Sequence, residues 1–296
     1  MEGCEGTGSP GGRLKMPVLT TKQILEDAAA NLAPSGTARR DAELLLLRAL
    51  GRDRAWLLAH PEAELTLEQQ AQFDAWIARR ALHEPVQYIL GEQEFYGLAM
   101  KVTPAVLIPR PETEHLVEAV LDRVPRNAKL RICDVGTGSG AIAVALAHAL
   151  PEAQVAAVDL SPAALAIARE NADRHHVAKR VLFIESDLLS ALPGERFDLV
   201  VSNPPYVAAE EELEPQVREW EPHTALFAGE SGLEVYERLI PQAWAALVPG
   251  GYLLLEIGHT QRDALAQILR QWNHVEFVAD LQRIPRVAIA RRGVGE

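Results

Sequence analysis

The chain has 296 residues, and its 29 lysine and arginine residues stand against 41 aspartate and glutamate residues, a formal net charge of −12. This acidic balance argues against a protein that coats nucleic acid. With 48% apolar and 24% charged residues, the chain can bury a large core, and its length suggests one large domain plus a smaller one.

The location expected for the protein is the cytoplasm. Only two cysteines occur, Cys4 and Cys133, and two thiols cannot build a disulfide framework, so a reducing compartment is expected. The sequence has no run of about 18 apolar residues, the length that a bilayer-spanning helix needs. Residues 1–15 are glycine-rich without the apolar core of a signal peptide, and we expect a flexible leader there.

Residues 16–85 are expected to form a small helical domain, because Ile24, Leu25 and Ala28 begin an apolar pattern with helical spacing. Two threonines are expected to cap helices. Thr37 is one of them, and the other is Thr66, whose capping box would be completed by a glutamine three residues later.

The composition changes over residues 86–109, where β-type side chains such as Phe95 and Leu98 flank Gly97. This pattern predicts a β-hairpin or an extended linker between two domains. The large domain is therefore expected to cover residues 110–296.

Residues 110–296 alternate between short apolar runs and helical stretches, which predicts a mostly parallel sheet covered by helices on both faces. The expected parallel strands are residues 130–135, 155–158, 181–184, 197–201 and 252–257. The last two runs, residues 275–278 and 286–290, lie too close together for a crossover helix, so an antiparallel pair is expected. The fold class is α/β, with a Rossmann-like domain.

A glycine-rich loop follows the first of these strands and opens an alanine-rich helix. The segment Asp134-Val135-Gly136-Thr137-Gly138-Ser139-Gly140 has the form Asp-x-Gly-x-Gly-x-Gly. Glycines let the backbone turn sharply and approach a ligand, and the helix start offers free N–H groups. A dinucleotide fingerprint would need a glycine at Ala141, so the segment instead resembles the first motif of Rossmann-like S-adenosylmethionine methyltransferases.

Asp159 ends the next expected strand, 19 residues after Gly140. A carboxylate in that place can accept hydrogen bonds from both ribose hydroxyls of a nucleoside cofactor. The resemblance to these methyltransferases also implies that Asp187 and Leu188, after the third strand, flank the adenine ring. The alternative is that Asp159 and Asp187 only cap helices.

The fourth strand runs directly into Asn203-Pro204-Pro205-Tyr206. Consecutive prolines fix φ and carry no N–H, so the turn is stiff and leaves carbonyl oxygens without local donors. The side-chain oxygen of Asn203 and the backbone oxygen of Pro204 can each accept one hydrogen of a planar NH2 group, on which Tyr206 can stack. We therefore interpret these four residues as catalytic, because they orient such a nitrogen for methyl transfer and stabilise charge developing on it.

The turn alone leaves two substrates open, a side-chain amide and the exocyclic amine of adenine in DNA or RNA. Residues 206–240 contain nine glutamates and two arginines, without aspartate or lysine. Such a surface would repel phosphates unless it faces away, which disfavours nucleic acid. A binding module without catalysis is a third reading, against which the intact turn speaks.

Residues 106–114, Val-Leu-Ile-Pro-Arg-Pro-Glu-Thr-Glu, closely resemble a segment of the peptide chain release factor glutamine methyltransferases. The order of parts is also similar, from the helical domain and hairpin to the glycine loop and the Asn-Pro-Pro-Tyr turn. Within this segment, Pro111, Glu112 and Thr113 either contact the cofactor or only shape a helix start.

The resemblance implies methyl transfer from S-adenosylmethionine to the amide nitrogen of the glutamine in the Gly-Gly-Gln motif of class I release factors. It implies no metal. By position, the cofactor residues would be Asp134, Gly136, Thr137, Gly138, Ser139, Gly140, Asp159, Asp187, Leu188 and Asn203. Asn203 would contact both ligands, and the helical domain with the hairpin would grip the release factor. We expect a monomer that binds neither nucleic acid nor membranes.

Overall fold

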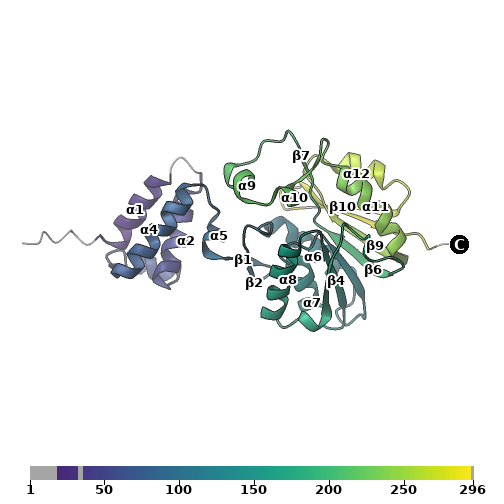
Figure 1. Cartoon of the computed structure of the whole chain (residues 1–296), viewed down its shortest axis with the longest axis horizontal. Helices are drawn as coiled ribbons and strands as arrows, with labels where there is room; N and C mark the ends of the chain where they lie inside the picture. Colours follow the sequence, from purple (N-terminus) through teal and green to yellow (C-terminus); the bar gives the residue numbers. More distant parts are fainter. Residues whose placement is uncertain (1–18, 33–35, 295–296) are drawn as a thin grey trace, which may run out of the picture. The chain divides into compact units, whose positions relative to one another are not determined.

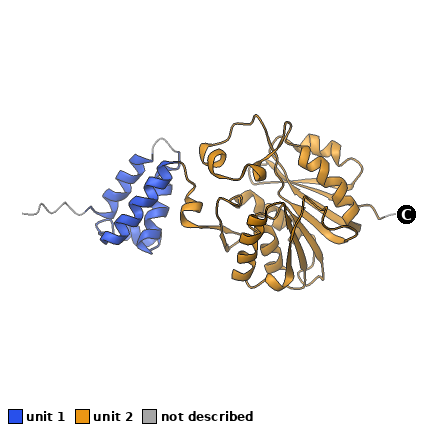
Figure 2. Cartoon of the chain, in the orientation of Figure 1, with its two compact units in different colours: residues 1–82 blue, residues 83–296 orange. Residues whose placement is uncertain are grey.

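The computed structural model describes residues 19–32 and 36–294 (Figure 1). The expected leader lies outside the described residues. The chain divides into two compact units, residues 1–82 and 83–296, drawn in separate colours in Figure 2. The expected hairpin belongs to the second unit.

The first unit is helical, as the apolar spacing predicts. Its elements are α1 (Thr21–Asn31), α2 (Ala38–Leu50), α3 (Arg54–Ala59) and α4 (Leu67–Ala81). Helices α1 and α4 each pack against α2, and they bury apolar side chains between them. The largest buried side chains here are Phe73, Leu45 and Leu46.

Capping explains where these helices start. The capping box of Thr66 and Gln69 is confirmed, and Thr20 with Gln23 forms a second one that the sequence analysis missed. Thr37 stands at the N-cap of α2 but makes no capping hydrogen bond with its side chain. Its hydroxyl donates instead to the Asp41 carboxylate at 2.9 Å.

The second unit starts with helix α5 (Val86–Leu90) and a hairpin of β1 (Glu92–Phe95) and β2 (Leu98–Lys101). The hairpin turn consists of Tyr96 and Gly97, with φ of 52° and 73°. A two-residue turn that follows strand twist needs positive φ at both positions. The hairpin expected from the β-type side chains around Gly97 is confirmed.

A seven-stranded sheet forms the centre of this unit, with strand order β10-β11-β9-β6-β3-β4-β5 (Figure 1). Neighbours from β9 to β5 pair in parallel, and β11 pairs antiparallel with β9 and β10. Both expectations for the sheet are confirmed. The strands are β3 (Arg131–Val135), β4 (Gln154–Asp159), β5 (Val181–Glu185), β6 (Phe197–Ser202), β9 (Leu247–Glu256), β10 (Asn273–Ala279) and β11 (Pro285–Arg291).

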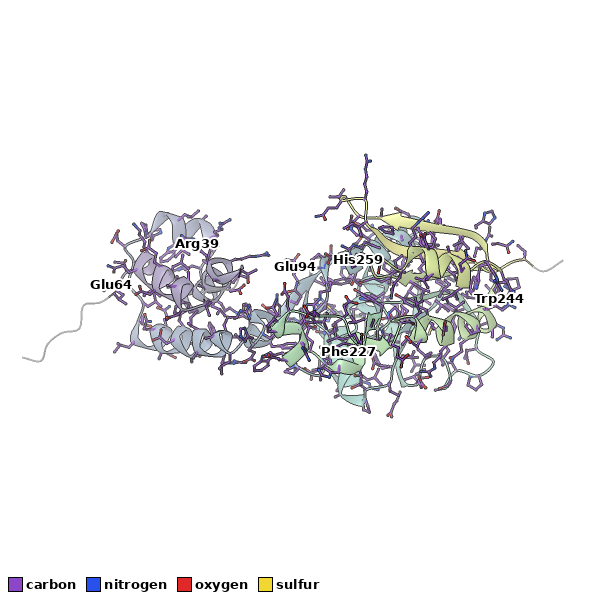
Figure 3. All side chains as sticks on the ribbon, turned by 90° about the horizontal axis from the view of Figure 1, so that it is seen from above. Arg39, Glu64, Glu94, Phe227, Trp244 and His259 are labelled. Carbon is purple, nitrogen blue, oxygen red and sulfur yellow. The ribbon has the colours of Figure 1, made fainter. Side chains whose placement is uncertain are left out.

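Successive side chains of each strand point to opposite faces of this sheet, so both faces are apolar and both are covered by helices. Ile132 of β3 joins the core packed under α6 and α7, and its neighbour Cys133 joins the core packed under α11 and α12. Trp244 of α11, labelled in Figure 3, packs edge-to-face on Trp272 in the second core. The helices are α6 (Glu114–Leu121), α7 (Ala141–Ala149), α8 (Pro162–Arg174), α11 (Glu234–Ala246) and α12 (Arg262–Ile268).

Shorter elements complete the unit. They are η1 (Pro111–Thr113), η2 (Ala178–Arg180), β7 (Val207–Ala208), α9 (Pro215–Trp220), α10 (His223–Leu226) and β8 (Phe227–Gly229). Strand β7, which follows the proline turn, pairs with β8, and β8 in turn contacts α11. Within residues 19–32 and 36–294, the helices are all too short or too polar to cross a bilayer.

Candidate active site

The glycine loop lies between β3 and α7 and needs its glycines for two different reasons. Gly136, Gly138 and Gly140 have φ of 71°, 55° and 81°, a region that side chains disfavour. A Cβ atom added at Gly136 or Gly138 would meet open space. A Cβ atom at Gly140 would lie 3.0 Å from Cβ of Ala168, so this glycine lets α7 start against α8. The first two therefore leave room for a ligand close to the backbone.

Asp134 supports the glycine loop and the start of α7 through hydrogen bonds to its side chain. Its side chain is fully buried, and its Oδ2 atom accepts the Thr137 hydroxyl at 2.6 Å and the Ala143 N–H at 3.1 Å. Burial raises the pKa of this carboxyl to about 7, against the two hydrogen bonds, which lower it. Among the described residues, its Oδ1 atom has no hydrogen-bond partner.

Asp159 is fixed at the end of β4 by backbone donors. Its Oδ2 atom accepts the Gly138 N–H and its Oδ1 atom the Ser161 N–H, both at 2.8 Å. Burial raises its pKa, and the backbone hydrogen bonds act in the opposite direction. The N-cap of α8 is Ser161 and not Asp159. It lies beside the glycine loop with its orientation fixed.

Asp187 and Leu188 follow β5 at the same edge of the sheet. Ser186, just before them, donates its backbone N–H to the Asp159 carbonyl at 2.9 Å. The Asp187 carboxylate is exposed and accepts Arg238 of α11 at 2.5 Å. Leu188 is half-buried with φ of 52°, an unusual value for a leucine. The turn thus places an apolar side chain and a charged pair one residue apart.

The Asn-Pro-Pro-Tyr turn leaves β6 next to the glycine loop. Ser202 donates its hydroxyl to the Val135 carbonyl at 2.6 Å, which joins the ends of β6 and β3. The side-chain NH2 group of Asn203 donates to the Thr113 hydroxyl at 3.1 Å. Since this bond uses the nitrogen, the Oδ1 atom of Asn203 is the end available to accept a hydrogen from a ligand.

The far side of the turn is anchored through Tyr206 and Gln261. The Gln261 side chain donates to the carbonyls of Tyr206 and Gly232 at 3.0 and 3.1 Å, and accepts the Gly258 N–H at 3.0 Å. A Cβ atom at Gly232 would lie 2.5 Å from the Tyr206 carbonyl, so only glycine allows this approach. Three loops at the sheet edge are therefore held together by one amide.

Glu256, at the end of β9, is a buried acid beside this turn. The Tyr206 hydroxyl lies 3.5 Å from its Oε1 atom, and Thr113 lies close enough to lower the pKa of this carboxyl. Burial raises the pKa of Glu256 to about 7. Burial also raises the pKa of Tyr206, with Glu256 adding to the effect, so the phenol stays neutral.

Three residues of this site were not found from the sequence as functional residues. Gln261 belongs to no motif of the sequence, and Thr113 lies in the segment that either contacts the cofactor or only shapes a helix start. Glu256 had one signal, a carboxylate at the end of the apolar run Leu253-Leu254-Leu255. His259, labelled in Figure 3, lies between Gly258 and Gln261 in the sequence, but its side chain makes no hydrogen bond to the described residues.

The sheet order, with the glycine loop and the Asn-Pro-Pro-Tyr turn at its carboxyl edge, defines a Rossmann-like methyltransferase domain. Two family descriptions match the chain: "PrmC N-terminal domain" over residues 23–91 and "Methyltransferase small domain" over residues 113–219.

Relatives extend over nearly the whole length. The release factor glutamine methyltransferase of Koribacter versatilis is 50% identical over 279 residues, 93% of this chain and 99% of the relative. The Escherichia coli K12 protein of the same name is 43% identical over 273 residues, 90% and 97% of the two chains. The chain belongs to the release factor glutamine methyltransferase family.

Solved structures agree on the fold of the large unit. The hMettl16 catalytic domain has a TM-score of 0.53 at 19% identity, covering 75% of this chain and 82% of that one. A T. thermophilus 16S rRNA methyltransferase, in complex with AdoMet and guanosine, has a TM-score of 0.51 at 20% identity, covering 68% and 49%. At such identity the likeness concerns the fold alone.

Proposed function

We propose that this chain transfers a methyl group from S-adenosylmethionine to the side-chain amide nitrogen of the Gly-Gly-Gln glutamine in class I release factors, in support of translation termination. The observation that carries the proposal is the hydrogen bond from Asn203 to Thr113, which leaves the Asn203 oxygen as an acceptor. Family membership supports the substrate, because relatives over nearly the full length carry that name.

The turn fits a primary amide for a simple reason. A planar NH2 group has two hydrogens, and the Asn203 Oδ1 atom and the Pro204 carbonyl are two acceptors one residue apart. Pro204 and Pro205 keep the turn stiff, so both acceptors stay in place while the nitrogen attacks. As positive charge develops on that nitrogen, the same two oxygens stabilise it. Tyr206 would stack on the amide plane.

The glycine loop and Asp159 fit a nucleoside cofactor. Open space above Gly136 and Gly138 lets a ligand approach the backbone, and Gly140 at the N-cap of helix α7 has no side chain to cap the first turn, of which Asp134 takes the Ala143 N–H. Asp159 would hold the ribose hydroxyls, with Leu188 and Asp187 beside the adenine. When bound, S-adenosylmethionine would supply an electrophilic methyl group and leave as S-adenosylhomocysteine, with one amide hydrogen lost as a proton. Asp134 shapes the loop through Thr137 and does not need to touch the ligand.

Charge favours the protein substrate over adenine in nucleic acid. The segment after the turn exposes Glu210, Glu211 and Glu212, which would repel a phosphate backbone. We propose that residues 16–85 and the hairpin recognise the body of the release factor, because one glutamine offers too little surface for selectivity. We also propose that the protein acts as a monomer in the cytoplasm, without binding nucleic acid.

The test compares acceptors under one set of conditions. The full chain is incubated with radiolabelled S-adenosylmethionine and a class I release factor, the same factor with Gly-Gly-Gln changed to Gly-Gly-Ala, or an adenine-rich DNA or RNA duplex. We expect label only in the unchanged release factor. Label in the Gly-Gly-Ala factor at the same rate would overturn the assigned glutamine, and label in nucleic acid alone would support the adenine reaction.

A further inference from the structure

Glu256 is a charged residue placed where an apolar one would be expected. It follows Leu253, Leu254 and Leu255 at the end of β9, and its side chain is 3% exposed. Burying a carboxyl costs free energy unless partners compensate it. Its Oε2 atom has no hydrogen-bond partner among the described residues, and its Oε1 atom is 3.5 Å from the Tyr206 hydroxyl. Packing alone does not account for such a residue.

Two residues connect this acid to the catalytic turn, Tyr206 and Thr113. Thr113 is buried close enough to Glu256 to lower the pKa of its carboxyl, and the Thr113 hydroxyl oxygen accepts the Asn203 NH2 group. A threonine hydroxyl has one hydrogen and can still accept with its oxygen. If that hydrogen goes to the carboxylate, the oxygen must accept from Asn203, and the Asn203 Oδ1 atom must face away, toward a substrate. An ionised Glu256 therefore fixes which end of the Asn203 amide is presented.

We propose that Glu256 is a positioning residue for methyl transfer, which orients the Asn203 amide through Thr113 and holds the Tyr206 phenol beside it. The proposal rests on the proposed function and deepens it. The acid touches neither substrate nor cofactor in this account. Its effect is to keep the acceptor oxygen, and not the NH2 group, directed at the substrate amide, since two facing NH2 groups cannot hydrogen-bond.

The positioning of the Asn203 amide requires that Glu256 is ionised. A neutral carboxyl carries an O–H that donates, so it competes with the hydroxyls that must donate to it. Burial raises its pKa to about 7, in the range where the enzyme would operate. The charged and titratable groups that face Glu256 or its partner phenol are Glu112, Arg110, Arg286, Tyr206 and Tyr236. Of these, Arg286 lowers the pKa of Glu256 and Glu112 raises it.

The decisive variant is Glu256→Gln, because glutamine keeps the size and always carries a donor, like the protonated acid. We expect kcat of the unchanged protein to rise with pH through about 7. We expect the variant to lack this rise and to stay near the low-pH level, roughly 10- to 100-fold below the unchanged protein at high pH. The KM for S-adenosylmethionine should not change. The matched control is Glu237→Gln, on the exposed side of α11.

Two threonine variants test the relay. Thr113→Val keeps the shape and removes the hydroxyl, so kcat should fall as in Glu256→Gln, while Thr113→Ser should restore it. The double variant Glu256→Gln with Thr113→Val should be no slower than the worse single one, because both act on Asn203. Additive losses in kcat, or a Glu256→Gln variant with the unchanged pH profile, would overturn the proposal.

A readout without turnover separates this proposal from the proposed function. The side-chain NH2 resonances of Asn203 are followed by NMR in the full chain while the pH is raised from 5 to 9. We expect them to shift with a midpoint of about 7 and to stay constant in Glu256→Gln. If the Asn203 resonances of the unchanged protein do not shift with pH, the positioning role is contradicted, even if release factors are methylated. Normal shifts without any methylation would instead count against the proposed function alone.

Discussion

The Asp159 carboxylate accepts the backbone N–H of Gly138 at 2.8 Å. The acid that would bind the ribose is thus hydrogen-bonded to the loop that would lie along the rest of the cofactor. Because Ser161 fixes the other carboxylate oxygen, Asp159 has little freedom before a ligand arrives. The cofactor half of the site is therefore organised by the protein itself, which lowers the entropy lost on binding.

Removing this carboxylate should weaken cofactor binding. Asp159→Ala loses the acceptors for the ribose hydroxyls and leaves the Gly138 N–H without its partner, so we expect Kd for S-adenosylmethionine to rise roughly 10- to 100-fold. Isothermal titration calorimetry measures it. Asp173→Ala, an exposed position on α8, serves as the control and should bind normally. Equal affinities of both variants would remove Asp159 from the cofactor site.

Gly140 should resist substitution for two separable reasons. Its φ of 81° is unfavourable for alanine, and the added Cβ atom would meet Ala168 at 3.0 Å. Gly194 has φ of 80° and open space around its Cβ position, so Gly194→Ala carries only the first penalty. We expect Gly140→Ala to lower the free energy of unfolding by about 1–3 kcal/mol more than Gly194→Ala in urea titrations. Equal losses of unfolding free energy would mean that α8 shifts to make room for the added methyl group at no measurable cost.

The Asn203 amide should matter for rate more than for stability. Asn203→Ala removes one of the two proposed acceptors, and we expect kcat to fall by roughly 10²- to 10³-fold with little change in the melting temperature. Asn273→Ala, exposed on β10, is the matched control. Wild-type turnover in the Asn203 variant would contradict the proposed mechanism.

The buried Asp134 should make stability fall as pH rises. Its pKa increases from 3.8 in the unfolded chain to about 7 in the folded one, so between these values the folded state binds more protons. Such a group stabilises the fold fully below the lower pKa and loses this contribution as pH passes through the higher one, at about 1.4 kcal/mol per pH unit.

Chemical denaturation between pH 4.5 and 7 of the unchanged protein and of Asp134→Asn tests this expectation. The variant keeps the shape and does not titrate, so the difference in unfolding free energy between the two proteins should change with pH in the stated direction. Parallel curves would mean that Asp134 stays ionised in the fold.

In the first unit, a buried ion pair should contribute more to the free energy of unfolding than an exposed one. Arg80 of α4 contacts Asp41 of α2 at 2.8 Å, with side chains 6% and 12% exposed. Arg80→Ala leaves the acid buried without this cation, and we expect a loss of about 3–5 kcal/mol in unfolding free energy. Arg54 pairs with Glu43 at 2.7 Å on the surface, and Arg54→Ala should cost less than about 1 kcal/mol. Similar losses would contradict this reading.

The sheet and the glycine loop were predictable because their signals are local. Apolar runs, turn glycines and the order of Asp134, Asp159 and Asn203 can be read along the chain, and parallel strands bring their carboxyl ends to one edge. Asp187 illustrates the limit, because its partner Arg238 lies 51 positions away. Hydrogen-bond partners that meet only through tertiary packing leave no periodic pattern in the sequence.

Glu256 and Thr113 show the same limit inside the site. An acid in an apolar strand is visible in the sequence, but its partner Thr113 comes from a segment before the first strand of the large sheet, far from β9 in sequence. The Asn203 to Thr113 bond spans 90 positions. The residues that make the turn were therefore predictable, and the residues that support it required the structure.

We propose that the Asn-Pro-Pro-Tyr turn positions the glutamine of a release factor for methylation. The most direct measurement is peptide mass spectrometry on a class I release factor after incubation with the full chain and S-adenosylmethionine. We expect one added methyl on the amide nitrogen of the Gly-Gly-Gln glutamine, and far less of it in the same time with the Asn203→Ala variant. A release factor that stays unmethylated at this glutamine, or carries the methyl group on another residue, would contradict it.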